Sequence, residues 1–202
     1  MHKESYNLMK YFVEKYLDTN SSLQILDVGS YDVNGNYKSL FEKLDWKYTG
    51  LDIVSGPNVD IVSKSDYDFG LSHKYDVIVS GNCLEHVEAP WKWIPEVAKY
   101  LKPGGLLCII TPFNIGEHRY PVDCWRILPD GYKYLLEHAG LFKVIESKIN
   151  YPPPEVKYKF FERRPDMEWL LRFIPQIIKE KVLVYHSGTT QDTIVVAYRN
   201  HE

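Results

Sequence analysis

The sequence is poor in several features that would assign it to a specialised class of protein. It has only three cysteines (Cys83, Cys108 and Cys124), an odd number without metal-ligand spacing, which excludes a disulfide scaffold and fits a reducing compartment. It shows neither a signal peptide nor an apolar run long enough to span a bilayer, so we expect no membrane insertion and a cytoplasmic location. A long basic run is also missing and the net charge is −3, which argues against a nucleic-acid partner.

The remaining composition is that of an ordinary globular domain. Of the 202 residues, 45% are hydrophobic and 25% are charged, enough to build one domain with a sizeable core. An amphipathic helix is predicted over about Lys3–Leu17, because apolar residues recur there at helical spacing. We find no internal repeat or low-complexity segment, and therefore expect a single domain over residues 1–202.

The most informative segment is 23–36. An apolar run, Leu23–Val28, contains Asp27 and ends at Gly29, and turn-forming residues follow before a helix that we expect to begin near Tyr37. A buried strand that leads into a tight glycine turn and then a helix is how α/β folds build a nucleotide pocket. Gly29 would let a ligand approach the main chain, because it has no Cβ. An ordinary strand–turn–helix without a ligand is the alternative.

Further predicted strands follow, and the next two are each followed by an acidic residue. The second, Tyr48–Asp52, ends in a carboxylate placed to accept hydrogen bonds from both ribose hydroxyls of an adenosine-containing ligand. The short third strand, Val59–Val62, precedes Asp66, whose carboxylate could meet an adenine amino group. The later strands are expected at Tyr75–Ser80, Leu106–Thr111, Phe142–Ile149 and Thr193–Arg199, with helices at about 89–100 and 129–139.

Four pieces of sequence carry a family resemblance: Ile25–Ser30, Gly50–Asp52, Leu84–Val87 and Leu101–Pro112. The chain resembles the class I S-adenosylmethionine-dependent methyltransferases, especially the compact type associated with sugar and polysaccharide O-methylation. The resemblance implies an α/β, Rossmann-like fold with a seven-stranded, mostly parallel sheet, an antiparallel last strand and helices on both faces. The expected parts are an N-terminal helix (1–20), a cofactor-binding core (22–149), a helical insertion (150–190) and the last strand (191–200).

The resemblance also implies S-adenosylmethionine as cofactor and S-adenosylhomocysteine as its product. The implied cofactor-binding residues are Asp27, Gly29, Ser30, Tyr31, Asp52, Ile53, Ser65, Asp66, Ser80 and Asn82. The glycine loop departs from the family pattern acid-x-Gly-x-Gly-x-Gly, because Tyr31 stands at the second glycine position and the next glycine is Gly35. Asn34–Gly35 still offers a residue able to take positive φ, so we expect a different loop geometry with the same ligand.

A loop after the fifth predicted strand, 113–126, is dense in polar and aromatic residues. Loops at the carboxyl edge of an open α/β sheet commonly bind ligands. We therefore expect the acceptor to contact the loop and the preceding Glu85. The expected residues are Glu85, Glu117, Arg119, Tyr120, Trp125 and Arg126. The alternative is a packed loop in which Arg119 pairs with Asp123 and Trp125 fills a gap.

In-line methyl transfer to a neutral sugar hydroxyl needs a base that removes the hydroxyl proton as the new bond forms. Histidine titrates near neutrality, and two histidines qualify: His86 after the fourth predicted strand and His118 in the 113–126 loop. Either would be the catalytic base, with Asp123 supporting it or binding a hydroxyl. Alternatively, His86 orients Glu85 or caps a helix, and His118 is a surface residue. We expect no metal.

The acceptor itself is predicted from the resemblance alone, as a sugar in a glycan or nucleotide-sugar, with another small molecule as the alternative. The 16 tyrosines and five tryptophans would suit sugar rings, but core packing explains them equally well. The stretch 165–181 is too apolar to lie alone in water. It is expected to cover the domain body, the acceptor pocket or a second subunit of a homodimer, and a neighbouring glycosyltransferase domain is a further expected partner.

Two rival functions would use a similar sheet. A reductase that binds NAD(P) would share the acid after the second strand, but the Gly-x-Gly-x-x-Gly pattern is absent after the first strand. A non-catalytic scaffold would need no pocket, and the presence of Gly29, Asp52 and Asp66 argues against it.

Overall fold

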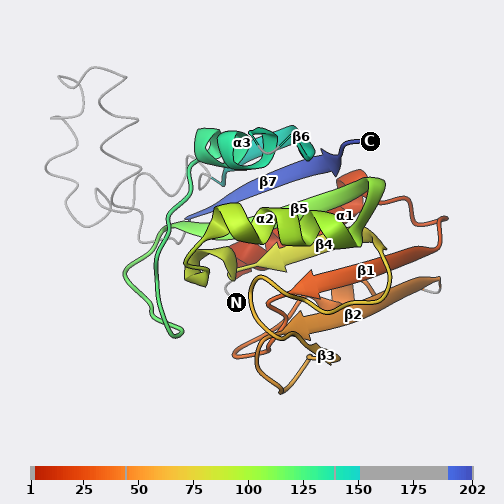
Figure 1. Ribbon diagram of the computed structural model, residues 1–202, viewed down its shortest axis with the longest axis horizontal. Helices are drawn as coiled ribbons and strands as arrows, with labels where there is room; N and C mark the ends of the chain where they lie inside the picture. The colour runs from red at the N-terminus through yellow and green to blue at the C-terminus, as the bar shows by residue number, and fades with distance from the viewer. Residues whose placement is uncertain (1–2, 44, 139, 151–190, 202) are drawn as a thin grey trace, which may run out of the picture.

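A computed structural model describes residues 3–43, 45–138, 140–150 and 191–201. Its seven strands form one sheet in the order β3-β2-β1-β4-β5-β7-β6 (Figure 1). The strands are β1 (Leu23–Val28), β2 (Trp46–Asp52), β3 (Ile61–Val62), β4 (Tyr75–Gly81), β5 (Leu101–Asn114), β6 (Phe142–Ile149) and β7 (Gln191–Arg199). The helices are α1 (Lys3–Tyr16), α2 (Pro90–Tyr100) and α3 (Pro129–Glu137), with 3₁₀ turns η1 (Lys38–Leu40) and η2 (Leu84–His86).

The direction of the strands confirms the predicted fold class. β1 pairs in parallel with β2 and β4, β2 with β3, and β4 with β5, whereas β7 runs antiparallel between β5 and β6. Parallel strands bring their carboxyl ends to a common edge, which is the left side of the sheet in Figure 1. The loops that leave this edge are where open α/β sheets hold ligands.

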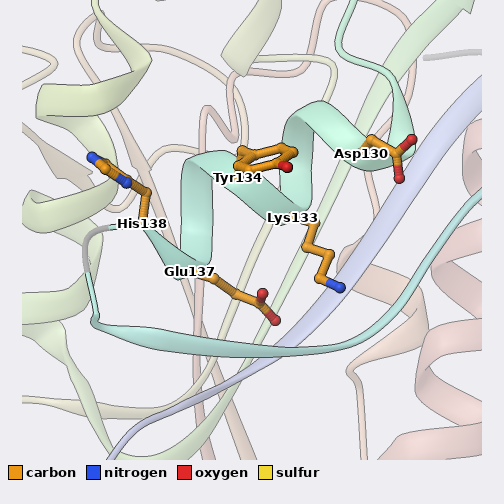
Figure 2. A pocket seen from close by; sticks show the side chains of 5 residues that line it. All are labelled: Asp130, Lys133, Tyr134, Glu137 and His138. Carbon is orange, nitrogen blue, oxygen red and sulfur yellow. The ribbon is translucent and has the colours of Figure 1, made fainter.

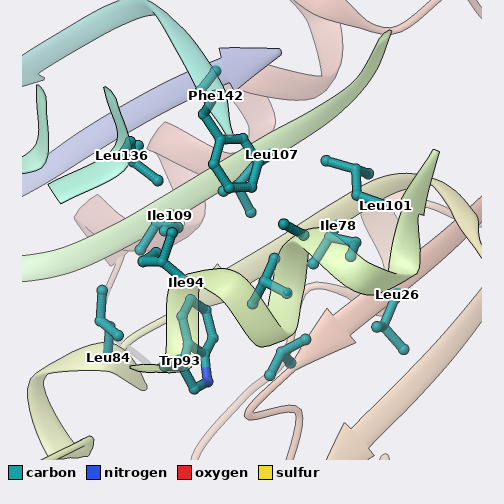
Figure 3. Close-up of a cluster of buried hydrophobic side chains, with 14 of the residues drawn as sticks. Leu26, Ile78, Leu84, Trp93, Ile94, Leu101, Leu107, Ile109, Leu136 and Phe142 are labelled. Atoms are coloured by element: carbon teal, nitrogen blue, oxygen red, sulfur yellow. The ribbon is translucent and has the colours of Figure 1, made fainter. Parts of the chain in front are cut away.

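Consecutive apolar side chains of the central strands point to opposite sides, so both faces of the sheet are apolar and both are covered by helices. In β1, Ile25 packs with α1 residues such as Phe12, while the adjacent Leu26 belongs to the cluster with Trp93 of α2 and Leu136 of α3. Figure 3 shows the α2–α3 cluster closing over the sheet. Because consecutive side chains point to opposite faces, a central strand that is covered on both sides reads as a continuous apolar run.

The boundaries differ from expectation at two instructive places. The helix expected near Tyr37 is only the 3₁₀ turn η1, because β2 already begins at Trp46 and leaves no room for several helical turns. β5 starts at Leu101, earlier than the predicted Leu106, and the register between β4 and β5 shifts before Leu106. Gly104, at φ +73°, lies within the bulged segment that joins the two registers.

The expected insertion at 150–190, including the apolar stretch 165–181, lies outside the described residues apart from residue 150. Within the described residues, no helix has both the length and the apolar character needed to cross a membrane.

Candidate active site

The carboxylate at the end of β2 is held by backbone donors from two loops. Asp52 Oδ2 accepts a hydrogen bond from the backbone N–H of Tyr31 at 3.1 Å, and its Oδ1 accepts one from the N–H of Val54 at 3.0 Å. Each oxygen still has a free lone-pair direction. Asp52, the residue predicted to bind the ribose, therefore lies at the end of β2 with its carboxylate fixed in orientation.

The glycine of the first loop is required for a reason that the sequence did not reveal. Gly29 has φ +81°, and a Cβ built there would lie 2.4 Å from Cys83 Sγ. The space that we expected a ligand to use is thus filled by the cysteine that follows β4. Gly35 also takes a positive φ, +114°, and its N–H donates to Asp32 Oδ1 at 2.5 Å, which closes the altered loop.

Two expected cofactor residues of this region have partners within the loops. The Ser30 hydroxyl donates to the backbone carbonyl of Asn58 at 2.9 Å, and the Asn58 amide donates back to the Ser30 carbonyl at 2.9 Å. The ring of Tyr31 lies against Gly56, where a Cβ would meet it at 2.2 Å. Ile53 is exposed beside this loop. These contacts tie the first loop to the one after β2.

Buried Asp27 faces the inside of the same region. Its side chain is 2% exposed and accepts a hydrogen bond of 2.6 Å from the Tyr48 hydroxyl. Burial raises the pKa of Asp27 to about 7, against the opposing effect of the Tyr48 hydrogen bond, and the nearby charge of Asp52 raises it further. Its carboxyl group therefore keeps its proton to a higher pH than an exposed aspartate does.

The residues expected at the end of β4 have structural contacts. Ser80 is fully buried and its hydroxyl donates to the Val28 carbonyl at 2.8 Å, so it joins β4 to β1 and does not face a ligand. Asn82 has φ +56°, and its Oδ1 accepts a hydrogen bond from the Ser5 hydroxyl of α1 at 2.7 Å. The Ser5 hydroxyl also lies 2.5 Å from that of Tyr37. This network fixes α1 against the carboxyl edge of the sheet.

The cofactor region carries acidic groups without basic partners. Within the described ranges, Asp27, Asp52 and Asp66 make no ion pair with Lys or Arg. Burial, and then the charges of Asp52 and Glu88, raise the pKa of Asp66. Ser65 is exposed, and its hydroxyl accepts a hydrogen bond from the Tyr67 N–H at 3.2 Å. A ligand that brings positive charge would relieve this acidic field.

A second group of candidate side chains lies after β4 and includes both histidines predicted as bases. Glu85, His86 and His118 each place one ligand-type atom within 4.8 Å of the other two. Glu85 is fully buried, no hydrogen-bond donor reaches either of its oxygens, and burial raises its pKa to about 8. His86 Nε2 lies 3.7 Å from Glu85 Oε1, and the His86 and His118 ring centroids are 5.0 Å apart. The two histidines predicted as alternative bases are therefore neighbours.

The loop between β5 and α3, residues 115–128, is held against this group by hydrogen bonds. The backbone N–H of Cys124 donates to the Glu85 carbonyl at 2.8 Å, and His86 Nδ1 lies 2.5 Å from the carbonyl oxygen of Val122. A carbonyl can only accept, so we assign the proton of His86 to Nδ1. Burial lowers the pKa of His86, although its contact with Val122 acts in the other direction. The neutral form of this imidazole is thus favoured.

Among the described residues, the partners of the Asp123 carboxylate are a guanidinium and a backbone N–H, and no histidine ring donates to it. The carboxylate receives two hydrogen bonds from the Arg126 guanidinium, at 2.5 and 2.7 Å, and one from the backbone N–H of His118 at 2.8 Å. The Arg126 contacts hold the pKa of Asp123 well below its usual range. The ion pair considered from the sequence, Arg119 with Asp123, is replaced by Arg126 with Asp123, and the pair shapes the loop that carries His118.

The other expected acceptor residues lie along the outer part of the loop. Glu117 and Arg119 are exposed and pair with each other at 2.7 Å, and Tyr120 is exposed. The Trp125 indole donates to the Val87 carbonyl at 2.9 Å and its ring stands edge-on to Trp91, with 6.0 Å between centroids. Trp91 is 58% exposed.

The sequence did not single out Trp91, which lies in the first turn of the predicted helix, α2, beside Trp125 of the loop. Sequence reasoning also missed Cys83 beneath Gly29. A surface hollow along α3 was likewise unforeseen (Figure 2); it is lined by Asp130, Lys133, Tyr134, Glu137 and His138, which spread from the start of the helix to just past its end. None of the predicted site residues lines it.

Comparison with protein families identifies this arrangement. Residues 1–148 match the sequence profile of a family described as the methyltransferase domain. The chain belongs to this family. It is therefore a methyltransferase of the S-adenosylmethionine-dependent type, and the reductase and scaffold alternatives are wrong. A comparison with curated protein sequences found no significant match.

Solved structures show the same fold at low sequence identity. A protein from Galdieria sulphuraria, provisionally described as a sarcosine dimethylglycine methyltransferase, is 15% identical, with a TM-score of 0.61 over 99% of this chain and 92% of that one. Haemonchus contortus phosphoethanolamine N-methyltransferase 2, in complex with S-adenosyl-L-methionine, is 14% identical, with a TM-score of 0.58 over 96% of this chain and 52% of that one. The [4+2]-cyclase SpnF is 15% identical, with a TM-score of 0.63 over 97% and 82%. The fold thus occurs with different reactions, and it does not identify the acceptor.

The described residues fit S-adenosylmethionine. The cofactor carries a sulfonium and an ammonium group against one carboxylate, and the unpaired acids Asp27, Asp52 and Asp66 supply the complementary charge. Asp52 would hold the ribose hydroxyls, because its oxygens lie at the strand end and two backbone N–H groups fix their orientation. The bound cofactor supplies an electrophilic methyl group, and the protein has to bring an acceptor to it and exclude water.

Proposed function

We propose that this methyltransferase transfers the methyl group to a hydroxyl of a sugar, in a glycan or a nucleotide-sugar. The observation that carries the proposal is the group of Glu85, His86 and His118 at the carboxyl edge. Trp125, whose backbone N–H donates to the Glu85 carbonyl, connects this group to the exposed indole of Trp91. A neutral hydroxyl must lose its proton as the new bond forms, and this group is equipped to handle that proton.

In the absence of a bound ion, His118 is the best candidate for the base. His86 has its Nδ1 directed at the Val122 carbonyl and its Nε2 directed toward Glu85. His118 is fixed through its backbone N–H to Asp123, which leaves its ring available to the acceptor. The acceptor hydroxyl oxygen would form the bond to the methyl carbon while the proton moves to the imidazole. The bond from carbon to sulfur would break, with its electron pair remaining on sulfur.

The tryptophans support a sugar as the acceptor. An exposed indole offers an apolar face for the C–H surface of a pyranose, while carboxylate and imidazole groups nearby can bond to its hydroxyls. Trp125 is locked by the hydrogen bond to Val87 and braces Trp91 edge-on. Such rigid rings bind a flat ligand at low entropic cost.

The test is an acceptor screen on the full chain. The protein is incubated with S-adenosylmethionine and a panel of sugars and nucleotide-sugars, and formation of S-adenosylhomocysteine is measured. A hit is then analysed by NMR to identify the methylated atom. We expect an O-methylated sugar whose formation decreases strongly in His118→Ala. Turnover confined to amines, or to non-sugar phenols, would overturn the sugar assignment.

A further inference from the structure

The buried carboxylate of Glu85 needs a partner that the described residues do not supply. It is completely buried and neither oxygen receives a hydrogen bond. A buried carboxyl group without a hydrogen-bond partner is unfavourable, and its ionised form becomes favourable only when it is paired or coordinates a metal ion. The nearest polar groups are two imidazoles, since one ligand atom each from Glu85, His86 and His118 lie within 4.8 Å of one another.

His86 is already arranged as a metal ligand. Its Nδ1 lies 2.5 Å from the Val122 carbonyl oxygen, so the proton is on Nδ1 and the lone pair of Nε2 points toward Glu85 Oε1, 3.7 Å away. Histidines that bind metals almost always donate their second N–H to a carbonyl or a carboxylate, which fixes the tautomer and the ring orientation. Burial favours the neutral, ligating form of the ring as well.

We propose that Glu85, His86 and His118 bind one divalent transition-metal ion. Two imidazole nitrogens and one carboxylate oxygen form the ligand set that zinc, cobalt, manganese and iron accept, whereas magnesium and calcium prefer oxygen ligands alone. Three protein ligands also leave a coordination position open, as in catalytic sites.

The surrounding geometry allows the site to close around an ion. Tetrahedral ligands at about 2.0–2.1 Å from the metal lie roughly 3.3 Å apart, so the contact between Glu85 and His86 is near the required spacing. His118 stands on the 115–128 loop and would complete the set by a small movement of its ring. Arg126 is the neighbouring cation, and its two hydrogen bonds to Asp123 balance its charge.

This inference rests on the proposed function and changes how the acceptor loses its proton. A hydroxyl bound at the open position would have a lowered pKa, because the ion stabilises the alkoxide. The proton would leave to solvent, the oxygen would bond to the methyl carbon and the carbon–sulfur bond would break. With the ion present, the two imidazoles hold the metal and do not act as bases.

The direct test measures metal binding without any turnover. The full chain is stripped with a chelator and titrated with Co²⁺, followed by its visible absorption, and with Zn²⁺ by calorimetry. We expect one ion per chain, bound at least 10-fold more weakly by Glu85→Gln and by His118→Ala, because each removes a ligand. His138→Ala is the matched control, since His138 is an exposed histidine just after α3. Circular dichroism verifies that each variant is folded.

The outcomes separate the metal site from the proposed function. Absence of saturable one-to-one binding, equal affinities in all variants, or a response to Mg²⁺ alone would overturn the metal site. Binding of S-adenosylhomocysteine by the stripped protein is measured in parallel. If the stripped protein binds this product and methylates its acceptor at the parental rate, the function stands and the ion has no role in it. If Co²⁺ binds as expected but S-adenosylhomocysteine does not, the proposed function is wrong.

Discussion

The two halves of the site are built by different means. On the cofactor side, Asp52 and the loops after β1 and β2 are held mostly by backbone hydrogen bonds, such as those from Tyr31 and Val54. Around the candidate base, groups from distant segments converge, as the His86 ring and the Val122 backbone carbonyl do across 36 residues. The first half has a geometry that the strand ends dictate, whereas the second depends on how one long loop folds.

This difference suggests a division of roles. The cofactor half follows from the shared strand ends and can serve any acceptor. The acceptor half can change with its loop without disturbing the sheet, as is usual for loops on a rigid scaffold. Variants should therefore affect one half at a time, and the predictions below test this separation from the largest expected effect to the smallest.

Removal of the His118 imidazole should impair methyl transfer without changing cofactor binding. We expect His118→Ala to lower kcat by roughly 10²–10⁴-fold, because the variant loses either a base or a metal ligand. The Kd for S-adenosylhomocysteine, measured by calorimetry, should stay at the parental value, and His138→Ala should behave as the parent. Near-parental turnover on the true acceptor in both His86→Ala and His118→Ala would contradict the proposed mechanism.

Loss of the carboxylate at the end of β2 should weaken cofactor binding and leave the group around His118 unchanged. Asp52→Ala removes two charge-assisted hydrogen bonds to the ribose, and we expect it to weaken S-adenosylhomocysteine binding by roughly 2–4 kcal/mol. Calorimetry on the folded variant measures this directly. Glu117→Ala, on the exposed part of the acceptor loop, provides the comparison and should leave cofactor affinity intact. Equal affinities in parent and Asp52→Ala would show that the cofactor is placed wrongly.

The two buried carboxyl groups, one in each half of the site, should make the free energy of unfolding depend on pH. Burial raises the pKa of Asp27 to about 7 and that of Glu85 to about 8, so the folded state keeps protons that the unfolded state releases near pH 4. The free energy of unfolding of the chelator-treated protein should therefore fall as pH rises from about 5 to about 8, by roughly 2–6 kcal/mol. Urea unfolding at several pH values measures this. Glu85→Gln should flatten the dependence, and an unchanged slope would show that the pKa of Glu85 is not raised in the folded state.

The exposed tryptophan should give the smallest effect and refine the acceptor half. Trp91→Ala removes one stacking surface, and we expect KM for a sugar acceptor to rise about 3–10-fold with little change in kcat. Trp91→Phe should restore part of the loss, because a ring remains. Steady-state kinetics measure both variants. A fall in kcat with unchanged KM would mean that Trp91 supports the loop and does not touch the acceptor.

Most of the fold could be predicted from the sequence, because most strands, including the edge strand β6, have strong local signals. Phe142–Ile149 was predicted with its observed bounds, and the parallel sheet with an antiparallel β7 was expected from the family resemblance. The helix predicted near Tyr37 was wrong because too few residues separate Tyr37 from Trp46 for several helical turns. The sequence pattern does not show that β2 begins at Trp46. The bulge that lengthens β5 depends on cross-strand register, which is a tertiary property.

The site could be predicted only in part. The positions of Asp52 and His86 could be predicted, because Asp52 ends β2 and His86 lies shortly after the end of β4. The partner of Asp123 could not be predicted, because Arg119 and Arg126 flank it and the loop's folding decides between them. The convergence of His118 on Glu85 is likewise a result of the loop's three-dimensional course. No local pattern connects residues so far apart in the sequence.

The contact between Gly29 and Cys83 bears on how this sequence can evolve. The sulfur occupies the volume that a side chain at position 29 would need, so a larger residue at 29 can be accommodated only if 83 becomes smaller. Even then the φ of +81° would strain any replacement. The two positions should therefore covary among relatives, and a sequence that departs from glycine at 29 should also carry glycine or alanine at 83 together with a rebuilt first loop.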